Sequence, residues 1–305
     1  MTLPEDWDKQ PLEQNIKGVL DKRGYWRRHC EDSVWSVEPG SVLSRYLDAT
    51  TGQLPGVLDE RRIPGNQIVS NYLLNSYNAM FALSSLWTRE GMITAAMEGP
   101  LMRAALLPAL TVAWVCDPAD ESEVHRRMMA LEARNHFEEA RFWSTFSGNT
   151  GVGAPGSAMA LLFAPTEEAA SNRRLLTKMT VVETSIWDAG AKAVLRNSDG
   201  DEQELLTSMW RFLSADAHAL MWGRRFRSGA QMLKTGEYPL GPDREWFALL
   251  CRLSEHSISE ARGLAERHGL RLDVPTVSRP GLLKKLLDPR GPDMVSSFMC
   301  GWDGL

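Results

Sequence analysis

Apolar residues recur every three to four positions along most of this chain, from Asn66 to Gly269, and nowhere alternate with a period of two for more than a few residues. The first spacing places apolar side chains on one face of a helix, whereas a half-buried strand needs the second. The pattern therefore predicts an all-α protein, a multi-helix bundle without any sheet of three or more strands.

Turn-forming residues divide the chain into three parts. Residues 1–65 are rich in turn formers and are expected to form an N-terminal arm packed on the body, with short helices around residues 11–31. Residues 66–270 form the helical bundle domain, and residues 271–305 form an irregular C-terminal tail. Gly269 is expected to cap the last helix at its C-terminus, because glycine tolerates the left-handed backbone found there.

Within the bundle, the apolar spacing places long helices over most of the domain, with a loop at residues 147–158, SGNTGVGAPGSA. Asp117 and Pro118 are expected to start the third helix, because both residue types favour a helix N-terminus. Glu121 and Glu123 then suit its positive end. The expected helices cover residues 66–91, 92–116, 117–146, 166–197 (one helix or two), 201–230 and 244–269.

Composition narrows the class of protein. With 43% hydrophobic and 24% charged residues in 305, the chain is that of an ordinary globular protein, and its net charge of −5 argues against a broad nucleic-acid-binding surface. Arg103 and Pro108 interrupt the longest apolar run, which argues against a membrane span. The scattered cysteines and histidines, and the lack of a Glu-x-x-His sequence, predict no bound metal and no cofactor. We expect a reduced, soluble, cytoplasmic protein.

One helix stands out for its polar face. In residues 201–230, positions seven apart lie on nearly the same side, two turns apart. One such series is apolar and the other is polar and charged. The apolar series is Leu206, Leu213 and Leu220, and the polar series is Glu204, Arg211, His218 and Arg225. The flanking arginines favour a neutral imidazole at His218, which suits a general base close to a phosphate.

The segment from Arg211 to His218, RFLSADAH, resembles the Arg-x4–6-His motif of the HEPN family. That resemblance implies an all-α, often dimeric protein and a metal-independent RNA endonuclease of a defence or toxin-like system. It assigns phosphate stabilisation to Arg211 and proton abstraction from a 2′-hydroxyl to His218. Phe212 departs from the family pattern, in which active members commonly carry a polar residue after the arginine.

Three further arginines follow the motif and are candidates for binding RNA phosphates: Arg224, Arg225 and Arg227.

We also expect a homodimer, with exposed aromatics such as Trp210 or Trp222 in its interface, because Trp and Arg are enriched at interfaces. The alternative is a non-enzymatic helical module that binds a protein partner or a small ligand. In that alternative Arg211 and His218 are structural polar groups.

Two other resemblances are less informative about activity. Arg103 to Trp114 and Leu213 to His218 look like paired helices in uncharacterised helical proteins of high-GC bacteria, which bring no known activity. Two acidic clusters are similar to the magnesium-binding motifs of terpene synthases, but helix capping explains such residues better. The clusters are Asp117, Asp120, Glu121 and Glu123, and Asn197, Asp199, Asp201, Glu202 and Glu204.

Overall fold

The computed structural model describes a largely helical chain. The described residues are 12–31, 34–54, 58, 61–90, 95–150, 166–196, 200–217 and 244–273. Helices hold 82% of them, and their only sheet has two strands, so the predicted all-α class is confirmed. In chain order the elements are α1 (Leu12–Leu20), α2 (Arg23–Glu31), β1 (Val34–Val37), α3 (Val42–Thr50), α5 (Gly65–Glu90), α6 (Ala95–Cys116), α7 (Glu121–Thr150), α9 (Glu167–Met179), α10 (Glu183–Val194), α11 (Gly200–Ala217), α13 (Arg244–Arg267) and β2 (Leu270–Asp273).

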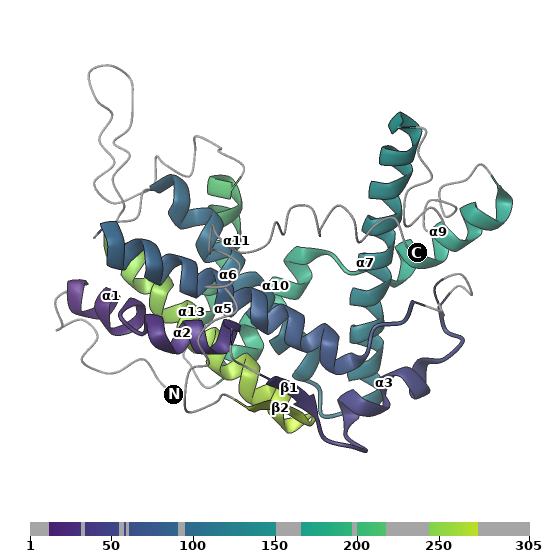
Figure 1. Cartoon of the computed structure of the whole chain (residues 1–305), viewed down its shortest axis with the longest axis horizontal. Coiled ribbons are helices and arrows are strands. Elements are labelled where there is room, and N and C mark those ends of the chain that lie inside the picture. Colours follow the sequence, from purple (N-terminus) through teal and green to yellow (C-terminus); the bar gives the residue numbers. More distant parts are fainter. Residues whose placement is uncertain are drawn as a thin grey trace, which may run out of the picture.

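Helix α6 lies at the centre of the body and packs against α5, α10, α11 and α13 (Figure 1). A helix surrounded in this way must be apolar on nearly all sides. Among the described residues, its stretch Met97–Cys116 is apolar and long enough to cross a membrane by length and composition, and 67% of that stretch is buried within the chain. Packing in the core accounts for this apolar character.

The N-terminal elements take part in the same core. Helix α1 packs on α13, and α2 packs on α5. Ile16, Leu20 and Trp26 are buried in the main hydrophobic cluster together with residues of α5 and α6. The described part of residues 1–65 therefore supplies core side chains to the body.

A short antiparallel ladder joins the segment after α2 to the last described residues of the chain. β1 pairs with β2 so that Val37 lies opposite Leu270. Gly269 precedes β2 and has a φ of 97°, which confirms the expected helix cap. With four residues in each strand, neither is long enough to show a clear alternation in the sequence. Residues 271–273 of the expected tail belong to β2, and residues 274–305 lie outside the described residues.

Helix α7 differs from expectation at both ends. It begins at Glu121 rather than at Asp117, because the Asp120 carboxylate caps it by accepting a hydrogen bond from the Glu123 backbone N–H (3.2 Å). It continues to Thr150, so the first four residues of the expected loop are helical. A glycine inside a helix costs about 1 kcal/mol, which a long helix tolerates. Residues 151–158 lie outside the described residues.

The C-terminal half of α7 and helix α9 project from the body (Figure 1). There they build a second, smaller hydrophobic cluster with the segment before α5. Its buried members are Leu54, Leu58, Ala133, Ala140 and Leu176. The molecule thus has a large core in the body and a small one under α7 and α9, with α10 between them.

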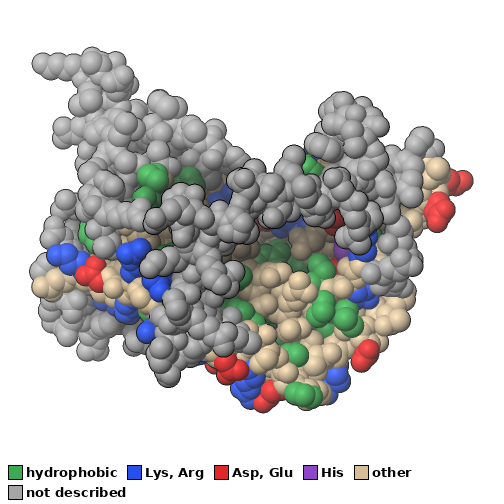
Figure 2. Space-filling view, viewed as in Figure 1, with side chains coloured by type: hydrophobic (Ala, Val, Ile, Leu, Met, Phe, Trp, Pro, Cys, Tyr) green, Lys and Arg blue, Asp and Glu red, His purple; other side chains and the backbone are tan. Residues whose placement is uncertain are grey.

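On the opposite side of the molecule, Lys and Arg side chains gather over α1 and α2 (Figure 2). We call this the basic surface; the Lys and Arg residues of α1, α2 and the turn between them are Lys17, Lys22, Arg23, Arg27 and Arg28. They lie on a chain whose net charge is −5, so this positive charge is local.

Candidate functional site

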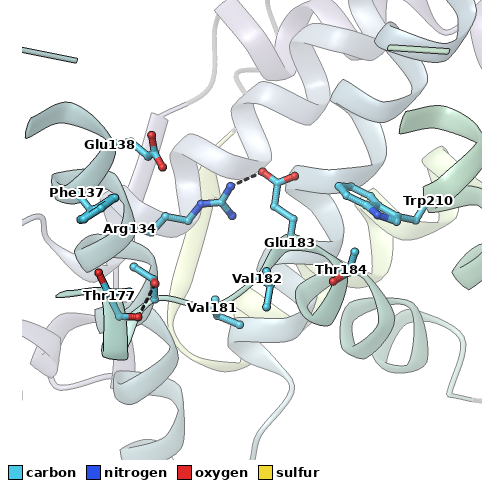
Figure 3. Close-up of a pocket in the computed structure, with 10 residues that line it drawn as sticks. Arg134, Phe137, Glu138, Thr177, Val181, Val182, Glu183, Thr184 and Trp210 are labelled. Carbon is cyan, nitrogen blue, oxygen red and sulfur yellow. Dashed lines mark hydrogen bonds and ion pairs between the residues drawn. The ribbon is translucent and has the colours of Figure 1, made fainter. Parts of the chain in front are cut away.

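A groove of about 420 Å³ lies where the projecting α7–α9 pair meets α10 and α11 (Figure 3). A volume in this range is typical of small-molecule sites, which combine apolar walls with a few converging polar groups. The lining residues are Arg134, Phe137, Glu138, Thr177, Thr180, Val181, Val182, Glu183, Thr184 and Trp210.

Helix α7 supplies one wall. Arg134, Phe137 and Glu138 are three and four residues apart, so they share one face of the helix. Phe137 also packs against the small hydrophobic cluster, which holds this wall in place. Glu138 lies near Arg141, with 3.9 Å between the carboxylate and the guanidinium.

Two lining residues, Arg134 and Glu183, form the floor of the groove and belong to an ion triad of one carboxylate and two guanidinium groups from three helices; its third member, Arg103, is not among the lining residues. Glu183, in the first turn of α10, accepts a hydrogen bond from Arg103 of α6 at one oxygen (2.9 Å) and one from Arg134 of α7 at the other. Its position also places negative charge at the positive end of α10. The triad therefore ties the projecting helix α7 to the body.

Trp210 of α11 forms the facing wall (Figure 3). The Arg103 guanidinium lies 4.8 Å from the centre of its ring, in cation–π contact. On the body side, Trp210 contacts Trp187, which is fully buried and donates a hydrogen bond to the Leu206 carbonyl (2.7 Å). Neighbours on both sides thus fix the orientation of the indole ring.

The connection between α9 and α10 completes the groove. Val182 is the N-cap residue of α10, makes no side-chain cap hydrogen bond and is 69% exposed. An apolar side chain that is this open, beside Val181 and three threonines, leaves apolar surface for a ligand to cover. The Thr180 hydroxyl donates to the Thr177 carbonyl (2.9 Å), which closes the end of α9.

The helix singled out from the sequence has the expected two-sided character in its described part. Leu206 and Leu213 are fully buried, whereas Glu204 and Arg211 are exposed. Trp210 is expected from the sequence to be exposed at a dimer interface, but it is half-buried. Trp187 and Arg103 of the same chain pack against its ring and cover part of it. Outside the described residues lie His218, Leu220, Trp222, Arg224, Arg225 and Arg227.

Arginines engage most of the first acidic cluster. Glu121 binds Arg45 (2.5 Å) and Asp117 binds Arg196. The hydrogen bond from Arg126 lowers the pKa of Glu123 to about 2; burial opposes this shift, and Arg127 adds to it. Among the described residues, no group of three or more His, Cys, Asp or Glu side chains could hold a metal ion. In the second cluster, Glu204 alone has a described side chain, and it is exposed.

A second polar cluster is buried between α3, α7 and the segment before α5. Glu132 is fully buried and accepts hydrogen bonds from the Tyr46 hydroxyl (2.6 Å), the Arg62 guanidinium (3.0 Å) and the Ile63 backbone N–H (2.7 Å). His136 lies 3.6 Å from the same carboxylate. A carboxylate surrounded by donors in this way holds elements together and has no open side for a substrate, so we assign this cluster to stability.

The fold and groove define an all-α protein with a polar-floored cleft between two hydrophobic clusters. Comparisons with protein-family models, curated proteins and solved structures found no match to this chain.

No sequence pattern singles out Arg134 or Glu183. Arg103 stands out in the sequence as an interruption of an apolar run and as the start of the stretch from Arg103 to Trp114. A single charged residue in an apolar run is a signal, because a partly buried arginine needs a partner of opposite charge. The sequence alone does not say which carboxylate is that partner.

Proposed function

We propose that this chain is a helical binding module that takes up a small organic ligand in the groove between α7, α9, α10 and α11. The observation that carries the proposal is that the groove combines apolar walls with a polar floor. Trp210 and Phe137 form the walls, and Arg134 and Glu183 form the floor. The volume of about 420 Å³ favours a small molecule over an extended protein surface.

Blocking the groove is expected to abolish binding. Thr184 is exposed and lines the groove, so Thr184→Trp adds a bulky side chain to the space that a ligand needs. The next residue, Ser185, is also exposed but is not among the lining residues, and Ser185→Trp is the matched control. We expect neutral and charged phenylalkyl and indolylalkyl fragments to bind the parent protein and Ser185→Trp, but not Thr184→Trp, in a protein-observed NMR titration.

Two outcomes of that titration contradict the proposal. One is that no fragment of the panel shifts resonances of groove residues in the parent protein. The other is that fragments bind Thr184→Trp as well as they bind Ser185→Trp, which would place their site elsewhere.

A metal-independent RNA endonuclease, the activity implied by the HEPN resemblance, is the second candidate. Exposure of Arg211 favours it, because a phosphate-binding cation must be accessible. The basic surface over α1 and α2 also offers positive charge to an RNA backbone. The predicted homodimer belongs to this candidate, since the family motif meets its symmetry mate at a dimer cleft.

The RNase candidate predicts a separable loss of activity. His218→Ala should reduce cleavage of a labelled single-stranded RNA by about a hundredfold, the usual effect of losing a general base. Arg211→Lys should also be impaired, because lysine keeps the charge but loses the planar pair of donors. EDTA should have no effect, and both variants should keep the parent melting temperature. Absence of cleavage by the parent protein would remove this candidate.

A further inference from the structure

The charges of the ion triad that borders the groove do not balance. Arg103 and Arg134 share the single carboxylate of Glu183, which leaves an excess of about one positive charge. Glu138, the other acidic residue of the lining, is offset by Arg141 on the same helix. The groove therefore lacks one negative charge, at the place where apolar walls would shield an ion pair from water.

Arg134 has hydrogen-bonding capacity left for that charge. A guanidinium has five N–H donors, and among the described residues Glu183 is the acceptor that Arg134 binds. Glu183 also holds Arg134 in place, and Arg103 holds Glu183 from the side of α6. Arg134 lines the groove, and its side chain is 31% exposed, so a ligand can reach the remaining donors.

We propose that the groove selects ligands with an apolar body and a single carboxylate, and that Arg134 binds this carboxylate. This inference rests on the proposed function, because it names the ligand class of the same groove. A guanidinium binds a carboxylate through paired N–H donors. A phosphate monoester carries a charge of about −1.5 to −2 at neutral pH, which exceeds the local imbalance. The carboxylate is therefore the better match.

A set of three probes tests the assignment: 4-phenylbutyrate, its neutral isostere 4-phenylbutyramide, and 4-phenylbutyl phosphate. We expect millimolar binding for fragments of this size, with the carboxylate bound about tenfold more tightly than the amide. The phosphate should bind no more tightly than the carboxylate. Dissociation constants come from protein-observed NMR titrations that follow the tryptophan indole resonances, with Trp210→Phe used to assign Trp210.

Variants locate the preference. Arg134→Gln should weaken carboxylate binding and bring the two dissociation constants to within about twofold of each other, because it removes the charge and keeps the apolar walls. Arg126→Gln removes the same charge from the same helix outside the lining and should keep the preference for the carboxylate, because its partner Glu123 still pairs with Arg127 and no lining residue loses a partner. Arg103 still pairs with Glu183 in Arg134→Gln, so the variant leaves no unpaired carboxylate, and thermal unfolding checks that it is folded.

Each contrary result has its own meaning. Equal binding of carboxylate and amide by the parent protein, or a preference that survives Arg134→Gln, overturns the inference but leaves the binding module standing. A preference lost equally in Arg126→Gln also overturns it, because net charge would then be the cause. Tighter binding of the phosphate than of the carboxylate overturns the assignment of a carboxylate ligand. Binding of none of the three probes contradicts both the inference and the proposed function.

Discussion

Glu132→Gln is expected to lower the free energy of unfolding by about 3–5 kcal/mol, the usual cost of breaking a buried ion pair from one side. The carboxylate is fully buried, and the side chain of its partner Arg62 is 8% exposed. Water therefore cannot solvate the Arg62 guanidinium once the carboxylate charge is lost. Every neighbour of the two oxygens is a donor. The glutamine amide must turn its own N–H groups toward one of them.

Urea denaturation measures this effect, with Glu138→Gln as the control on the same helix. The Glu138 side chain is 58% exposed and lies 3.9 Å from Arg141, so its loss should change the free energy of unfolding by less than about 0.5 kcal/mol. A similar effect for both variants would show that the buried cluster contributes no more to stability than a surface ion pair.

The same carboxylate predicts a pH dependence. Burial alone would raise the pKa of Glu132, but His136, Tyr46, the Ile63 N–H and Arg62 together outweigh burial and lower it. The unfolded chain therefore binds a proton at Glu132 more readily than the folded chain does. The stabilisation that the ionised Glu132 gives to the folded state is complete above the unfolded pKa of about 4.3. It is lost as the pH falls through the lower, folded pKa. The difference between the parent protein and Glu132→Gln should therefore shrink in strongly acidic solution.

Gly190→Ala is expected to destabilise the protein by about 3 kcal/mol, toward the upper end of overpacking effects. A Cβ at residue 190 would lie 2.2 Å from the Leu110 carbonyl oxygen, and this neighbour is backbone of the central helix α6. Helix α10 must then move away from α6. Because α10 carries Glu183, the variant should also weaken fragment binding in the groove.

Gly263→Ala provides the matched comparison for this substitution. Residue 263 is exposed on α13, and a Cβ there would meet no atom within 4 Å. Alanine restricts the unfolded chain more than glycine does, so this variant should be neutral or stabilised by up to about 1 kcal/mol. Thermal and urea unfolding of both variants measure the contrast. Equal stability of Gly190→Ala and the parent protein would mean that α6 and α10 are not packed this closely.

The amino-acid sequence by itself determined the helical class, the position of most long helices, the cap at Gly269 and the two faces of α11. These features depend on neighbours within a few residues, whose spacing and backbone preferences are visible in the chain. The same local view misplaced the start of α7, where Asp120 rather than Asp117 provides the cap. It also missed β1 and β2, whose pairing joins residues more than 200 positions apart.

Only the tertiary structure decided where the groove lies and which charges meet in it. Arg103 lies 80 positions before Glu183 and Arg134 lies 49 positions before it, and no local pattern links the three residues. Trp210 belongs to a wall of this groove for the same reason, because its neighbours come from α6 and α10. Partner choice among distant side chains depends on how helices pack, and the packing is a property of the whole core.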